Sequence, residues 1–108
     1  TAASMQSFAT ASRSAQGVSV DVLVTAGLSN SRSAGADADY FVVCENDGED
    51  EQELTPGTIN TIIIVNAPLT QGAQVEAYAI AIEAKCSACV NHGVVCAKDP
   101  TKFGMGTG

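Results

Sequence analysis

The chain has 108 residues, of which 45% are hydrophobic, and a net charge of -7 at pH 7. This length suits one small domain, residues 1–108, and the hydrophobic content excludes a disordered chain. The negative charge argues against nucleic-acid binding and against docking on anionic lipid, because both need a basic surface. No apolar run approaches the roughly 20 residues of a membrane span.

The first residue, Thr1, has three possible origins. Removal of an initiator Met, removal of a signal peptide, or an autocleavage that exposes a threonine nucleophile would each leave it first. Four cysteines in 108 residues favour an oxidising environment. We therefore expect a secreted, extracellular protein.

The first predicted element is a short amphipathic helix within residues 1–17. Met5, Phe8 and Ala9 fall on one face at helical spacing, and Gly17 is a natural helix end. Such a helix would be able to cover one face of a sheet.

Two predicted strands follow, with a loop between them. In residues 18–27, VSVDVLVTAG, valine occupies alternate positions from Val18 to Val24, which predicts a half-buried strand. Residues 27–39 are rich in Gly, Ser and Asp and are predicted to form a loop. Residues 40–44, YFVVC, are predicted to form a short apolar strand.

Six of the twelve acidic residues lie between Glu45 and Glu53. Like charges at this density repel one another out of a core, so the segment is predicted to be a solvated hairpin loop. A calcium site is the alternative, although the spacing does not follow the EF-hand pattern.

A third strand is predicted in residues 58–66, TINTIIIVN, directly after Pro56 and Gly57. Both of its faces are partly apolar, which indicates a central strand or one covered by a neighbouring molecule. The strand carries no charge, and we expect it to mediate assembly of the chain with itself. The expected assembly residues are Thr58, Ile59, Thr61, Ile62, Ile63, Ile64 and Val65.

A long helix is predicted from about Gln71 to Asn91, ending at Gly93. Residues 94–97, VVCA, could add a last short strand. The apolar stripe of the helix is expected at Val75, Ala79, Ile82, Cys86 and Cys89. This order of elements predicts an α+β fold, with a largely antiparallel sheet and two helices packed on one of its faces.

Three of the four cysteines and the only histidine lie within twelve residues. Cys86, Cys89, His92 and Cys96 have spacings that zinc could use, but a continuous helix would spread them along its length. A redox pair at Cys86 and Cys89 would lack the help of a helix N-terminus. Buried free thiols are a further alternative. We expect disulfides, within or between chains, and neither a metal nor a cofactor; the candidate residues are Cys44, Cys86, Cys89 and Cys96.

Four segments resemble adenosylcobinamide amidohydrolases in their order and spacing: VTAGLSNSRSAG (24–35), PGTINTIIIVNAPLTQGA (56–73), the helix segment ending in EAK (83–85), and the closing GMGTG (104–108). The opening TAASM also looks like a family segment. The resemblance implies hydrolysis of the amide that attaches an aminopropanol arm to a corrin ring. It also implies that this chain corresponds to the C-terminal half of family members that are about twice as long. The polar residues that match the family are Thr25, Ser29, Asn30, Asn60, Asn66, Glu83 and Lys85.

Two alternatives concern these polar residues. Glu83 and Lys85 could act as a carboxylate and ammonium pair around an amide, or both could lie on the exposed face of the helix. The three asparagines could serve catalysis, or they could satisfy loop backbone at strand ends.

Three functions are carried forward. The first is a secreted structural protein that assembles with itself on the cell surface, as the tubular sheath proteins of methanogenic archaea do. The second is an amidohydrolase, or one chain of it, acting on a corrinoid. The third is a corrinoid-binding module without catalysis. The acidic insert and the cysteines near the helix end depart from the family pattern and favour the first.

Overall fold

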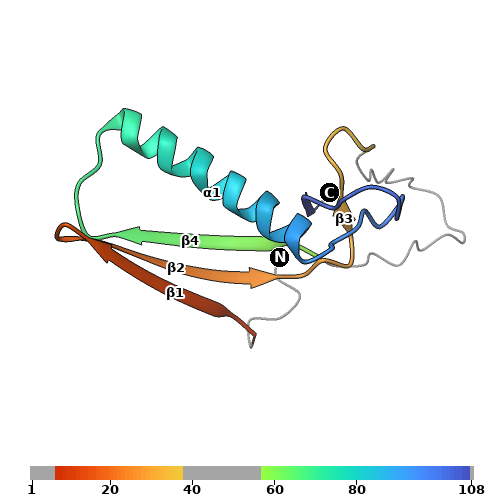
Figure 1. The fold of residues 1–108 in the computed structure, drawn as a ribbon, viewed down its shortest axis with the longest axis horizontal. Coiled ribbons are helices and arrows are strands. Elements are labelled where there is room, and N and C mark those ends of the chain that lie inside the picture. The colour runs from red at the N-terminus through yellow and green to blue at the C-terminus, as the bar shows by residue number, and fades with distance from the viewer. Residues whose placement is uncertain (1–6, 38–56, 108) are drawn as a thin grey trace, which may run out of the picture.

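In the computed structural model, which describes residues 7–37 and 57–107, one long helix lies over an antiparallel sheet (Figure 1). Its described elements are β1 (Ala9–Ala15), β2 (Val18–Ala26), β3 (Ser31–Arg32), β4 (Ile59–Val65), α1 (Gln71–Asn91) and β5 (Gly106–Thr107). The predicted α+β class and antiparallel sheet are confirmed. The described residues contain one helix rather than two, and α1 is not long and apolar enough to cross a membrane.

The segment that was expected to form the first helix contains β1 instead. Ala9 to Ala15 pair antiparallel with β2, and the chain reverses at Gln16 and Gly17, which both have positive φ. The glycine read as a helix end is therefore part of a hairpin turn. The local preference for a helix does not decide the structure here, because as a strand the segment forms a complete ladder of hydrogen bonds with β2.

The three-stranded sheet has the order β1-β2-β4. The strand predicted around Val18 to Val24 is confirmed as β2, and it is the central one. The strand predicted in residues 58–66 is confirmed as β4. It was expected to be either a central strand or one covered by a neighbouring molecule, and among the described strands it pairs only with β2 and so lies at the edge of the sheet.

A second, small ladder joins β3 to β5, with Arg32 opposite Gly106. The predicted loop therefore contains a two-residue strand. Residues 94–97 do not form a strand of their own, although Val95 makes an isolated bridge with Phe103. The predicted strand at residues 40–44 and the acidic segment lie outside the described residues.

The bounds predicted for α1 are confirmed, but the predicted stripe is largely wrong. Of the five predicted stripe residues only Cys89 lines the cavity between α1 and the sheet, so the stripe mostly faces away from the sheet. The face turned toward the sheet is built from small residues one turn apart, namely Ala77, Ala81, Ala84 and Ala88. Because alanine and isoleucine occur on both sides of the helix, hydrophobic spacing alone did not identify the buried side.

The core of the described part is thin. Its buried side chains are Thr25, Ser31, Cys89 and Cys96, and the last two are the only hydrophobic ones. Several large apolar side chains are exposed, including Ile62, Ile64 and Tyr78. The described sheet and helix therefore leave many large apolar side chains at the surface.

Candidate functional site

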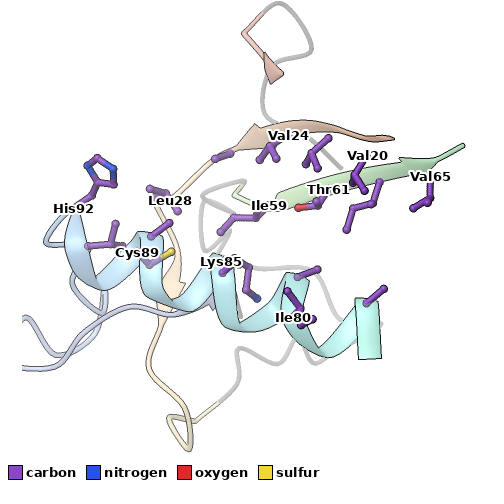
Figure 2. A pocket seen from close by; sticks show the side chains of 18 residues that line it. Val20, Val24, Leu28, Ile59, Thr61, Val65, Ile80, Lys85, Cys89 and His92 are labelled. Carbon is purple, nitrogen blue, oxygen red and sulfur yellow. The ribbon is translucent and has the colours of Figure 1, made fainter. Parts of the chain in front are cut away.

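A cavity of about 650 Å³ separates α1 from the sheet. Figure 2 shows side chains of β2 and β4 pointing toward the helix, among them Val20, Val24 and Thr61. Most of the wall is aliphatic, and the polar side chains on it belong to Thr61, Lys85 and His92. An apolar cavity with a few polar groups is the usual form of a small-molecule site.

The helix is fixed at its start by Thr70, whose hydroxyl accepts a hydrogen bond of 3.3 Å from the backbone N–H of Ala73. This N-cap satisfies one of the helix's otherwise unpaired donors. From there α1 runs over the sheet to Asn91, with His92 as its C-cap. Lys85 and His92 thus reach the cavity from the last two turns of the helix.

Lys85 is half-buried, and its stem forms part of the cavity wall. A side chain placed on Gly106 would meet the Lys85 Nζ at 3.2 Å. The absence of a side chain at this position of β5 therefore leaves room for the ammonium group. The resemblance singled out both the EAK segment and GMGTG, and the structure brings them together.

A second close approach joins the loop before β3 to the start of β4. A Cβ on Gly57 would collide with the carboxamide of Asn30 and lie 3.0 Å from the hydroxyl of Ser29. The Asn30 Oδ1 is buried without a hydrogen-bond partner. The alternative that the three asparagines satisfy loop backbone therefore does not hold for the side-chain oxygen of Asn30, which accepts no hydrogen bond.

The remaining asparagines do two different things. Asn66 accepts from the Ser19 N–H at 2.8 Å and donates to the Gly17 carbonyl at 3.3 Å, which agrees with the structural one of its two alternative roles. Asn60 instead donates to the hydroxyl of the buried Thr25 at 3.3 Å. This pair lies on the sheet face opposite the cavity, so neither residue can act with Lys85.

Neither of the two alternatives for Glu83 and Lys85 describes both residues. Residues two apart on a helix point to different sides, and Glu83 is exposed while Lys85 turns to the cavity. Of the family-matching polar residues, the structure thus leaves Ser29, Asn30 and Lys85 around the β3–β5 end of the molecule.

The three cysteines that the structure describes do not form a shared site. Cys86, Cys89 and Cys96 are free thiols, and Cys44 lies outside the described residues. The Cys86 Sγ lies 3.8 Å from the carbonyl oxygen of Met105. In residues 7–37 and 57–107, no three His, Cys, Asp or Glu side chains lie together as metal ligands would. The zinc spacing in the sequence is therefore not realised there, and cross-linking stays a prediction.

Cys96 occupies a tight turn and is 1% exposed. A hydrogen bond from the backbone N–H of Ser33 is the main cause that lowers the pKa of Cys96 to about 7, and burial opposes it. The backbone N–H groups of Lys98 and Asp99 lower this pKa further. An ion pair of 3.1 Å between Asp99 and Lys102 helps to hold the turn.

Ser31 and Gly104 were not singled out by the sequence analysis as separate site residues. Ser31 is 2% exposed and donates to the Val95 carbonyl, while a Cβ on Gly104 would come within 2.8 Å of both groups. The only signal was their presence inside segments with a family resemblance. These contacts join β3 to the segment that follows α1.

No curated protein and no solved structure was found to match the chain. The family model for adenosylcobinamide amidohydrolase matches residues 1–108. The chain belongs to the adenosylcobinamide amidohydrolase family.

Proposed function

We propose that this chain acts in the hydrolysis of a corrinoid amide, with Lys85 as the residue that contacts the amide. The observation that carries the proposal is the position of Lys85, the one cationic side chain that the described residues place on the wall of an otherwise largely aliphatic cavity, in a chain whose whole length matches an amidohydrolase family. An apolar wall would accept the body of a large organic substrate, and a single cation on that wall would orient a carbonyl group.

Hydrolysis of an amide places negative charge on the carbonyl oxygen as water attacks the carbon. A fixed cationic donor stabilises that charge, and Lys85 is suited to this role because Gly106 leaves space around its Nζ. Water also has to lose a proton. His92 is the only histidine of the sequence, lies on the same wall and would be the general base. It would then give this proton to the amide nitrogen as the C–N bond breaks, so that aminopropanol leaves as an amine and the corrinoid keeps a carboxylate. Lys85 and His92 are about 10 Å apart along the helix axis, so both side chains must turn toward one carbonyl group.

The test is release of aminopropanol from adenosylcobinamide by the chain and by the Lys85→Met variant, which keeps an unbranched apolar stem of similar length. Loss of one such donor is expected to lower kcat by roughly 100- to 1,000-fold. Glu83→Gln is the matched control, because Glu83 lies two residues away on the same helix and is exposed. Its kcat should stay within about threefold of the parent value.

Two outcomes would decide against this function. Corrinoid binding without any release of aminopropanol would leave a binding module. Equal kcat values for Lys85→Met and the parent would remove Lys85 from the mechanism. The secreted, sheath-forming role stays a prediction, and electron microscopy of native material would test it by looking for an ordered polymer.

A further inference from the structure

Among residues 7–37 and 57–107, β4 pairs with β2 along one edge only, and its other edge carries an ordered row of backbone groups. Thr58 accepts from the Gly27 N–H at 2.7 Å, and the Asn66 N–H donates to Ser19 at 3.1 Å. Both residues bond toward β2, and they are an even number of positions apart. In an antiparallel ladder hydrogen-bonded pairs alternate with non-hydrogen-bonded pairs, so the even-numbered residues of β4 bond to β2. The odd-numbered residues direct their N–H and C=O groups to the other edge: Ile59, Thr61, Ile63 and Val65.

This edge is complementary to itself. In an antiparallel pair of two β4 strands centred on Ile62, Ile59 lies opposite Val65 of the other copy, and Thr61 lies opposite Ile63. All four outward-bonding residues of each copy then have partners, which gives eight backbone hydrogen bonds. Moving the centre by one residue in either direction leaves one outward-bonding residue of each strand without a partner. The register about Ile62 therefore satisfies the most groups.

The side chains favour the same arrangement. Ile62 is 56% exposed and Ile64 is 60% exposed, both on the sheet face opposite α1, and β4 contains no charged residue. The other edge of the sheet is different, because β1 is built from Ala, Ser and Thr and carries Arg13. A charge on an edge strand opposes pairing with another chain, whereas an uncharged aliphatic edge invites it.

We propose that β4 is the contact between two copies of this chain, which pair antiparallel about Ile62 into one six-stranded sheet. The two copies have a closed, twofold arrangement, with both helices on the same side of the joined sheet. Seven residues bury much less than the roughly 800 Å² per partner of a standard interface, so the dimer is expected to be weak, with a Kd in the micromolar range or above. This inference is independent of the amidohydrolase function.

The register is tested by an Ile62→Cys variant under mild oxidation. In the proposed pair Ile62 faces its own copy as a non-hydrogen-bonded pair, where Cα atoms lie about 4.5 Å apart and a disulfide can form. Ile64→Cys is the matched control. Its two copies would lie about 13 Å apart, beyond the reach of a disulfide. Cross-linked dimer should accumulate at least tenfold faster for Ile62→Cys than for Ile64→Cys or for the parent chain with its own four cysteines.

Sedimentation velocity on the parent chain over a range of concentrations supplies the second measurement. A dimer fraction that rises with concentration is expected. Ile62→Lys should abolish it, because two ammonium groups would then face each other across the twofold axis. Circular dichroism of this variant should match the parent, since residue 62 is exposed. A parent chain that stays monomeric up to millimolar concentration, or equal cross-linking at positions 62 and 64, would overturn the proposal.

Discussion

Backbone N–H groups surround the sulfur of Cys96 and favour its thiolate form over its thiol form. The pKa of this residue falls from its ordinary value of 9.0 to about 7 in the folded chain, chiefly through the Ser33 N–H. The unfolded chain has no such donors and keeps the ordinary pKa. Folding is therefore linked to the loss of a proton at this one position.

The stability of the folded chain should consequently rise between about pH 7 and pH 9. The folded state loses the Cys96 proton before the unfolded state does, so this contribution is complete above the unfolded pKa and disappears as the pH falls through 7. Urea unfolding at several pH values under reducing conditions measures it. Cys96→Ala should flatten the rise, whereas Cys89→Ala, which removes another buried thiol, should leave its slope unchanged. The same slope in both variants would contradict the assignment.

For single residues, the sequence gives the type of side chain but seldom the residues that it contacts in the folded chain. Asn66 could be predicted to satisfy strand-end backbone because asparagine does this locally. The contact of Lys85 with Gly106 could not be worked out from spacing, because 21 positions separate them and β5 has only two residues. Only the resemblance to a family placed both segments in one protein.

The helix α1 is the element that the sequence defines most fully. Thr70 supplies a capping hydroxyl directly before Gln71, and Gly93, with φ of +66°, follows the C-cap residue His92. These end signals are local, which is why both bounds could be predicted. The buried side could not, since α1 is apolar on more than one face.

Replacing Thr70 with Ala should lower the free energy of unfolding by about 1 kcal/mol, because the Ala73 N–H loses its partner. Thr70→Asp is the control, since a carboxylate at the N-cap accepts the same bond and also interacts favourably with the helix dipole. Thermal unfolding of both variants checks the prediction. A loss of equal size in both would show that the hydroxyl does not act as a cap.

The β1–β2 pair shows why local patterns fail for small residues. The Ala, Ser and Thr residues between positions 9 and 15 have only weak preferences for one secondary structure. These preferences do not prevent the segment from pairing with a neighbouring strand. β2 has an unmistakable alternation of valines, and its unpaired edge fixes the conformation of the segment beside it. The helical spacing of Met5, Phe8 and Ala9 was therefore a weaker indicator of structure than the hydrogen bonds that β2 offers to a neighbouring strand.

For the molecule as a whole, the sequence predicted the α+β class and the antiparallel sheet, but neither the sheet order nor the cavity. Strand order depends on contacts between distant segments, and β2 and β4 are separated by more than thirty residues. The cavity depends on the distance between the helix and the sheet. The pattern of apolar residues in β4 does not determine this distance. The two partly apolar faces of β4 were correctly predicted, while its position in the sheet was left between two alternatives.

Filling the cavity should separate stability from ligand binding. Ala81→Leu adds aliphatic atoms to the wall that faces the sheet, and we expect a gain of about 1 kcal/mol in the free energy of unfolding. The same change should weaken corrinoid binding, because the space is taken. Ala79→Leu is the control on the exposed side of the same helix, with little effect on either quantity. A less stable Ala81→Leu variant would show that the helix and sheet leave no usable space.

The turn at Gln16 and Gly17 also bears on the order of events as the chain folds. It joins Ala15 directly to Val18, so the β1–β2 hairpin closes a loop of only two residues. Hairpins of this kind form within about 1–10 μs, whereas pairing β2 with β4 must first close a loop of more than thirty residues. Docking of β4 is therefore the slower step, and α1, which follows β4 in the chain, is placed over a sheet whose other two strands are already joined.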